Sequence, residues 1–165
     1  RGRLGPADSP PLPAAAGLSG YPLRSRCSGP HLRVARADVL GGPPALLVSA
    51  LSFISRRLVL PVLRDLVEPS GDLVLLVKPQ FEVGRERLGK GGVVRSAHNR
   101  AMVIEEVVAA ATTVGLTAKG LRGSPIRGAT GNAEYLLWLT RRHDEGLTTA
   151  QVTELDATVS TEAPY

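Results

Sequence analysis

The strongest constraint in this sequence is a short aliphatic run, Leu73–Val77, which is followed by Lys78 and Pro79. Five aliphatic residues in a row, bounded by Asp72 and the Lys-Pro pair, are typical of a strand buried in a sheet. Proline pushes the residue before it into extended geometry, so Lys78 belongs to the end of this strand. The sequence therefore predicts a fold built around a buried strand over residues 72–78.

The segments before this run alternate between strand and helix patterns. Residues 45–51 form a second apolar run, predicted to be a strand buried on both faces. Ser52 and Ser55 are placed to cap the helix that follows. Residues 56–67 carry a helical stripe of aliphatic side chains, formed by Leu58, Val59, Val62, Leu63 and Leu66. Pro61 lies within the stripe, so the helix either kinks there or begins there.

The segments after the run continue the alternation. Ser96 is predicted to cap a helix over residues 97–114, and Gly115 to end it. Strands are expected over residues 116–121 and 133–140. The order of strand, helix, strand, helix, strand and strand predicts an α/β fold with right-handed crossover connections.

Composition divides the chain into three parts. Its 165 residues suffice for one domain. Residues 1–40 are rich in Arg, Gly, Pro, Ser and Ala and have no strand or helix period, so they are predicted to be irregular. Residues 41–142 are expected to hold the ordered domain. Residues 143–165 are acidic and rich in threonine, and are predicted to be a disordered tail.

The charge balance also differs along the chain. The net charge is +5, but residues 46–142 hold fourteen basic groups against eight acidic ones. This excess suits a polyanionic partner such as RNA, and it equally suits ordinary solubility.

Metal and membrane functions find no support in the residue pattern. Cys27 is the only cysteine, which rules out an intramolecular disulfide and weakly indicates a reducing cytoplasm. The three histidines do not cluster with carboxylates at ligand spacing, so we expect no metal. No apolar run approaches the roughly 20 residues of a membrane span, so we expect no membrane partner.

Two residues stand where an α/β sheet can carry chemistry. Lys78 ends a buried strand, at the sheet edge where ligands bind, and a partly desolvated lysine there could serve as a base. Glu134 shares one face of its predicted strand with Leu136 and Trp138, and a carboxylate among such neighbours needs a partner. The alternative is a lysine and an acid that simply reach water at the strand ends.

A loop rich in glycine and charge, over about residues 82–95, holds four basic residues, Arg85, Arg87, Lys90 and Arg95. Its glycines would let the backbone approach a ligand, and its cations could hold RNA phosphates. A flexible, solvated loop is the alternative. The pattern is not that of a P-loop.

Three motifs, in matching order and spacing, resemble the TlyA family of ribosomal RNA 2′-O-methyltransferases, whose members are also described as haemolysins. They are Leu51–Ser55, Leu73–Arg95, and Ser124–Gly128 followed by Gly131–Leu139. The resemblance covers roughly residues 39–140, and three ordered motifs are far more specific than any one of them.

This resemblance implies an FtsJ-like fold, that is, part of a Rossmann-like class I methyltransferase sheet with helices on both faces. It implies S-adenosylmethionine as cofactor and cytidine ribose 2′-hydroxyls of ribosomal RNA as substrate. The family uses a Lys-Asp-Lys-Glu tetrad, in which the second lysine corresponds to Lys78 and the glutamate to Glu134. Methyl transfer itself requires no metal.

The sequence departs from the family pattern in its first part. Ala50 stands where the family has its aspartate. The family's first lysine, glycine-rich cofactor loop and RNA-binding S4-like domain are expected before residue 39 and have no counterpart there, so the cofactor-binding residues stay unassigned. The N-terminal strands of the sheet should then be missing, which would leave an unpaired strand edge and an exposed apolar face.

These departures leave two alternatives to an active methyltransferase. The first is a catalytically inactive remnant that still binds RNA. The second is a membrane-active haemolysin, as the family's older name suggests. The sequence contains neither a basic amphipathic helix nor an apolar span that would favour it.

Overall fold

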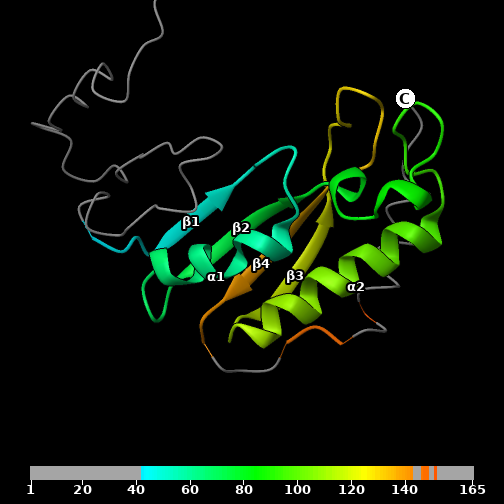
Figure 1. The fold of residues 1–165 in the computed structure, drawn as a ribbon. Helices are drawn as coiled ribbons and strands as arrows, with labels where there is room; N and C mark the ends of the chain where they lie inside the picture. Colours follow the sequence, from blue (N-terminus) through cyan, green and yellow to red (C-terminus); the bar gives the residue numbers. More distant parts are fainter. Residues whose placement is uncertain (1–41, 143–145, 149–150, 152–165) are drawn as a thin grey trace, which may run out of the picture.

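The computed structural model describes residues 42–142, 146–148 and 151, which contain one four-stranded mixed sheet and two α-helices (Figure 1). The predicted irregular segment 1–40 and most of the predicted tail lie outside the described residues. In chain order the elements are β1 (Leu46–Ser49), α1 (Arg56–Leu66), β2 (Asp72–Val77), the 3₁₀ turns η3 (Pro79–Phe81) and η4 (Arg85–Arg87), α2 (Ala97–Thr113), β3 (Thr117–Gly123) and β4 (Tyr135–Thr140).

The strands lie in the order β1-β2-β4-β3. β1 pairs parallel with β2, whereas β4 lies between β2 and β3 and is antiparallel to both. The predicted run over residues 72–78 is thus a central strand, with β1 on one side and β4 on the other. The predicted class, an α/β fold consistent with part of a Rossmann-like methyltransferase sheet, is confirmed.

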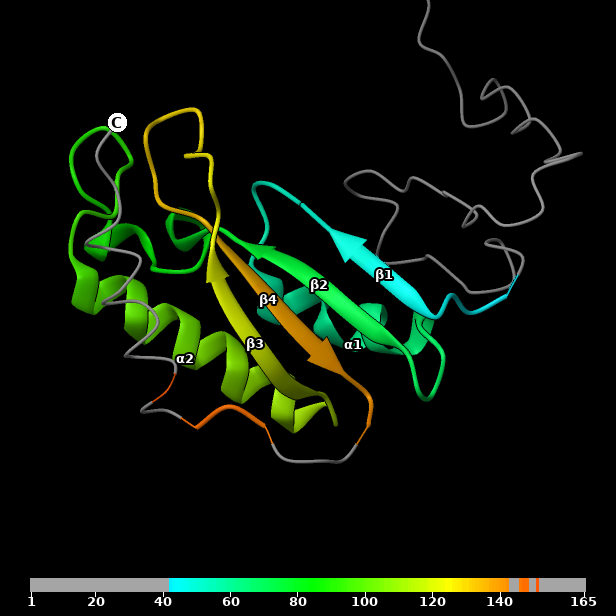
Figure 2. The same ribbon diagram turned by 180° about the vertical axis from the view of Figure 1, so that it is seen from behind.

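Both helices lie on the same face of the sheet, as the two opposite views show (Figures 1 and 2). The connection β1-α1-β2 and the connection β2-α2-β3 step across the sheet in the same direction. Two right-handed crossovers that step the same way place their helices on the same face. The resemblance implied helices on both faces, and among the described residues only one face carries them.

The core lies between this face and the two helices. In strands β2 and β4 every second side chain points toward the helices and is fully buried. These side chains are Leu73, Leu75 and Val77 of β2 and Tyr135, Leu137 and Leu139 of β4, which pack against Val59, Leu60, Leu63, Val103, Ile104 and Val107 of the helices.

The prediction that residues 45–51 form a strand buried on both faces is wrong. β1 is shorter, and it is the last strand at one end of the sheet. Leu46 is 56% exposed and Val48 69% exposed, because both point away from the helices. An aliphatic run alone does not distinguish an edge strand from a central one.

Helix α1 begins at Arg56 and runs through Pro61, so the alternative start at Pro61 is wrong. Ser55 is the N-cap residue, but its side chain makes no capping hydrogen bond. Its hydroxyl donates to the Glu82 carboxylate instead. Leu63 is buried as predicted, whereas Leu58 is 63% exposed and lies on the outer side of the helix.

Helix α2 has the ends that the sequence predicts. Ser96 accepts a hydrogen bond from the Asn99 N–H at its N-terminus. Gly115 has a φ of 75°, and the Leu116 and Gly115 N–H groups donate to the Ala111 and Thr112 carbonyls. This pair of bonds is the Schellman motif, which requires a left-handed residue that glycine supplies most readily.

Replacing Ser96 with alanine should lower the free energy of unfolding by about 1 kcal/mol, because the first turn of α2 loses its side-chain acceptor. Urea denaturation measures the change. Ser70, an exposed residue in the turn before β2, provides the control, and Ser70→Ala should stay within about 0.5 kcal/mol of the parent. Equal losses in the two variants would contradict the assigned cap.

Candidate active site

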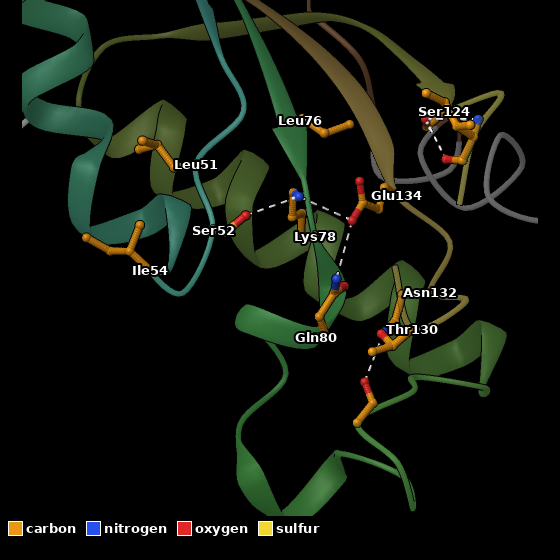
Figure 3. Close-up of polar contacts among 12 residues, drawn as sticks. Leu51, Ser52, Ile54, Leu76, Lys78, Gln80, Ser124, Thr130, Asn132 and Glu134 are labelled. Atoms are coloured by element: carbon orange, nitrogen blue, oxygen red, sulfur yellow. Dashed lines mark hydrogen bonds and ion pairs between the residues drawn. The ribbon is translucent and has the colours of Figure 1, made fainter. Parts of the chain in front are cut away.

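The register of β2 with β4 places Lys78 and Glu134 opposite each other at one end of the sheet. Val77 pairs with Tyr135, so the next residue outward on each strand is Lys78 or Glu134. Lys78 Nζ lies 3.4 Å from Glu134 Oε1. The two side chains are only 17% and 7% exposed, so the pair is largely withdrawn from water (Figure 3).

Ser52 is the second partner of the lysine. Lys78 Nζ donates to Ser52 Oγ over 3.2 Å (Figure 3). Ser52 belongs to the loop between β1 and α1, so the ammonium is held from two neighbouring strands, β1 on one side and β4 on the other. Together, the contacts with Ser52 and Glu134 hold the Lys78 side chain across the carboxyl ends of β1 and β2.

Glu134 is held tightly from its other side. Gln80 Nε2 lies 3.4 Å from Glu134 Oε1, while the buried Gln80 Oε1 has no partner among the described residues. A β-carbon added at Gly128 would lie 2.6 Å from the same carboxylate oxygen. Only glycine at position 128 leaves the carboxylate where it is.

Asn132 joins the two loops that surround the pair. It is buried, its Oδ1 accepts from the Val94 N–H over 2.9 Å, and its Nδ2 donates to the Gly92 carbonyl over 2.9 Å. The loop before α2 is thereby fixed to the loop before β4, and both lie at the same end of the sheet (Figure 1). Only Ala133 separates Asn132 from Glu134 along the chain.

A buried arginine braces the loop that carries Ser52. Arg56 has no exposed surface, and its guanidinium donates to the carbonyls of Leu51, Ile54 and Leu76. The Leu51 and Ile54 carbonyls flank Ser52, and Leu76 lies two residues before Lys78. Burial lowers the pKa of Arg56, although Glu82 and Glu134 oppose this shift.

Glu82, in the loop after β2, binds the first residues of α1 and its N-cap. Its carboxylate accepts from the Arg56 N–H and from Ser55 Oγ, each over 2.5 Å. Burial raises the pKa of the Glu82 carboxyl, although these two donors and the charges of Arg56 and Arg57 act in the opposite direction. Ser55 therefore serves as a link between loop and helix in place of its predicted capping role.

The four basic loop residues differ in their surroundings. Arg85, Lys90 and Arg95 are exposed. Arg87 Nη1 lies 4.0 Å from Glu106 Oε1 and 3.5 Å from the Met102 sulfur, so α2 holds this side chain.

Ala50, where the resemblance leads us to expect an aspartate, directly follows β1 and is exposed. It shares the alternation of Leu46 and Val48, so its side chain belongs to the face without helices. An alanine there offers no group that could contact Lys78.

The sequence pointed to Lys78 and Glu134 as site residues, but not to the residues that hold this pair. Those residues are Ser52, which contacts the lysine, and Arg56, Gly128 and Asn132. None of these residues follows a strand or helix period that would mark it. Ser52, Gly128 and Asn132 lie inside the three motifs, which was the only available signal, and Arg56 directly follows the first motif. Among the described residues, no group of three or more His, Cys, Asp or Glu side chains is placed to hold a metal ion.

Changing Glu82 to glutamine should reduce the pH dependence of stability. Because the folded state raises the pKa of this carboxyl, it binds the proton more tightly than the unfolded chain does. The free energy of unfolding should therefore fall as the pH rises from the ordinary glutamate range through the raised value. Urea unfolding of both proteins between about pH 4 and pH 7 measures this slope. The same slope in both proteins would show that Glu82 is not its source.

Changing Gly128 to alanine should force the Glu134 carboxylate away from Lys78 and lower the free energy of unfolding by about 1–3 kcal/mol. Gly120→Ala is the matched control, since its β-carbon would meet Trp138 at an ordinary 3.5 Å. The control should change stability by less than about 1 kcal/mol. Comparable losses in both variants, measured by denaturation, would argue against the close approach at Gly128.

Comparison with known proteins relates this chain to methyltransferases. Residues 26–141 match the FtsJ-like methyltransferase family. A candidate rRNA methyltransferase of Bacillus subtilis, YqxC, is 48% identical over 103 residues, which are 62% of this chain and 37% of that protein. The 16S/23S rRNA (cytidine-2′-O)-methyltransferase TlyA of Mycobacterium tuberculosis is 43% identical over 110 residues, which are 67% of this chain and 41% of that protein.

A solved structure agrees with these relatives. The structure of a candidate hemolysin from Streptococcus thermophilus superposes with a TM-score of 0.74 at 38% identity, and covers 79% of this chain and 48% of that one. The chain thus spans less than half the length of each of these three relatives. The resemblance read from the motifs is confirmed, and the chain belongs to the FtsJ-like methyltransferase family.

Proposed function

We propose that this chain carries the proton-accepting part of a ribosomal RNA 2′-O-methyltransferase, with Lys78 as the base and Glu134 as its support. The observation that carries the proposal is the held lysine at the carboxyl edge of the sheet. Its Nζ lies 3.4 Å from Glu134 and 3.2 Å from Ser52, and the side chain is largely shielded from water. The similarity to an rRNA cytidine-2′-O-methyltransferase supports the choice of substrate.

The chemistry of ribose methylation requires such a group. A ribose hydroxyl is a poor nucleophile, and it must lose its proton as the oxygen gains a methyl group. Lys78 Nζ, when neutral, can accept that proton, and the Glu134 carboxylate then stabilises the ammonium that forms. Ser52 and Glu134 together fix the direction in which the nitrogen meets the hydroxyl.

S-adenosylmethionine would supply the electrophilic methyl group in this reaction. The residues that the structure describes do not complete a site for it. The carboxyl end of β1 carries Ala50 in place of an acid, and the β1–α1 loop, residues 50–55, contains no glycine through which the backbone could approach a ligand closely. The part of such a site that these residues would supply is the proton acceptor.

The basic loop is proposed to contact RNA phosphates. Arg85, Lys90 and Arg95 are exposed and follow the strand that carries Lys78, so a bound RNA strand would meet them beside the base. Arg87, which is paired with Glu106, would contribute less. An rRNA substrate would place this activity in the cytoplasm.

One observation favours a second candidate, a catalytically inactive RNA-binding remnant. Ala50 stands where the family's tetrad has its aspartate, and among the described residues Glu134 is the only carboxylate within ion-pair distance of Lys78. A haemolysin function is supported only by the names of some relatives. No helix in the described part of the chain is long and apolar enough to cross a membrane.

The two candidates are separated by a chimera in which residues 46–141 replace the matching segment of the Bacillus subtilis relative. The proposal predicts methyl transfer to ribosomal RNA, measured with radiolabelled S-adenosylmethionine. Lys78→Met should lower the rate by about 10²–10⁴-fold, because the general base is lost. Glu134→Gln should lower it by a smaller factor, and Ala50→Asp should raise it.

Arg64→Ala is the control, since Arg64 lies on α1 and pairs only with its neighbour Asp65 among the described residues. Its rate should match the parent chimera. A folded chimera that binds RNA but transfers no methyl group, even with Ala50→Asp, would favour the inactive remnant.

A further inference from the structure

The loop that carries Ser52 has a backbone conformation that such residues rarely adopt on their own. Phe53, directly after Ser52, has a φ of 61°. This left-handed region is unfavourable for a bulky side chain, and it persists only where the surroundings impose it. The Phe53 ring meets Phe81 at a centroid distance of 5.0 Å but is 90% exposed, so its packing offsets little of this strain. The loop therefore needs a brace from elsewhere in the fold.

The N-terminus of α1, which directly follows this loop, is capped from outside the helix. Ser55 makes no side-chain capping bond, and the first turn of α1 contains no acidic residue. Instead, the Glu82 carboxylate accepts from the Arg56 N–H and from Ser55 Oγ, each over 2.5 Å. A carboxylate is favoured there because a helix N-terminus carries partial positive charge. Glu82 is only 4% exposed, so these contacts take the place of water.

Glu82 and Lys78 lie on the same turn after β2. The Phe81 N–H donates to the Lys78 carbonyl over 2.9 Å, which closes the turn between them. This turn contacts the segment from β1 to α1 at two points, through Lys78 at Ser52 (Figure 3) and through Glu82 at the N-terminus of α1. A shift of either segment would disturb both contacts.

Arg56 connects the Glu82 contact to the loop around Ser52. Its backbone N–H donates to Glu82. Its guanidinium donates to the carbonyls of Leu51 and Ile54, which flank Ser52. Displacement of the Arg56 backbone would therefore be transmitted to both sides of the serine.

We propose that Glu82 is a positioning residue for Lys78, because it fixes the loop that places Ser52 against the lysine amine. The role of Lys78 as the base rests on the proposed function, whereas its placement does not. The competing explanation is that Glu82 only stabilises α1. The two explanations differ in whether Glu82 restrains the Lys78 amine in the folded chain.

Chemical labelling of lysine amines measures this restraint in the purified 165-residue chain. The only other lysines are Lys90, which is exposed, and Lys119 on β3, so mass spectrometry compares all three in one sample. Under limiting reductive methylation, Glu82→Ala should speed labelling of Lys78 by about two- to tenfold, as expected for the loss of one hydrogen bond. Labelling of Lys90 and Lys119 should stay at the parent rate.

Two further variants show whether Glu82 acts through Ser52. Ser52→Ala should speed labelling of Lys78 by a similar factor, and adding Glu82→Ala should have no further effect, because both changes remove the same contact. Glu82→Gln should label like the parent. Its amide oxygen can accept from the Arg56 N–H, and its amide nitrogen can donate to Ser55 Oγ.

Asp72→Asn is the matched control for loss of an acid. Asp72 accepts from Trp138 and Arg142 at the opposite end of β2, so this variant should leave Lys78 labelling unchanged. Where Glu82→Ala does not fold, Ser55→Ala removes one of the two bonds to Glu82. It should speed labelling of Lys78 in the same direction by a smaller factor.

Three results would overturn the proposal. In the first, Glu82→Ala lowers the melting temperature but leaves Lys78 labelling at the parent rate, so that Glu82 is a structural cap. In the second, Glu82→Ala speeds labelling of all three lysines alike, which indicates general loosening. In the third, the effects of Glu82→Ala and Ser52→Ala add in the double variant, so that Glu82 does not act through Ser52.

The same substitution has a kinetic consequence in the chimera described above. Glu82→Ala should lower kcat by about tenfold or more and leave KM for ribosomal RNA unchanged, because the base is misplaced while RNA contacts remain. Labelling requires neither cofactor nor methyl transfer. Failure of this proposal is therefore distinguishable from failure of the proposed function.

Discussion

The antiparallel register of β2 with β4 is the constraint on which the rest of the site depends. It sets Leu76 opposite Leu136 and, one step beyond Val77 and Tyr135, Lys78 opposite Glu134. Side chains alternate faces along a strand, so a slip of one residue would move Glu134 to the helix side and leave the lysine without its carboxylate. The same register buries Leu75 against Leu137 and Val77 against Tyr135 beneath the helices. Packing of the apolar core therefore fixes the relative position of Lys78 and Glu134.

Burial and charge act together around this pair. Arg56 and Glu82 are both withdrawn from water, and each is stabilised by hydrogen bonds to the loops rather than by solvent. A buried charge without partners would cost several kcal/mol, so the loops that carry Ser52 and Lys78 cannot move apart without exposing unpaired groups. On the face of the sheet without helices, Asp72 accepts hydrogen bonds from Trp138 and Arg142. Burial would raise the pKa of its carboxyl, but hydrogen bonds from Trp138 and Thr140 and the Arg142 charge hold that pKa below its ordinary value.

The sequence predicted the elements that have a local cause. The Lys-Pro pair ended β2, Ser96 capped α2, and Gly115 stopped it, since each acts on its own backbone. The prediction failed where the burial of a residue depends on residues elsewhere in the chain. Whether Leu46 and Val48 are buried depends on the neighbours of β1, and whether Leu58 is buried depends on how α1 rotates against the sheet. Lys78 and Glu134 could be marked singly from their positions, but only the strand order brings them together. Arg56 and Asn132 gave no pattern because they contact residues 20 or more positions away. Gly128 gave none because its role is the space that it leaves for the Glu134 carboxylate.

The described strands carry the proposed base, and we propose that they lack the residues that would hold the methyl donor. Calorimetric titration of S-adenosylmethionine into the purified 165-residue chain tests this most directly, with Trp138 emission and near-ultraviolet circular dichroism confirming that the chain is folded. We expect no heat of binding at micromolar concentrations. Binding in the micromolar range by the folded chain alone would contradict it, and would mean that the chain already contains a cofactor site.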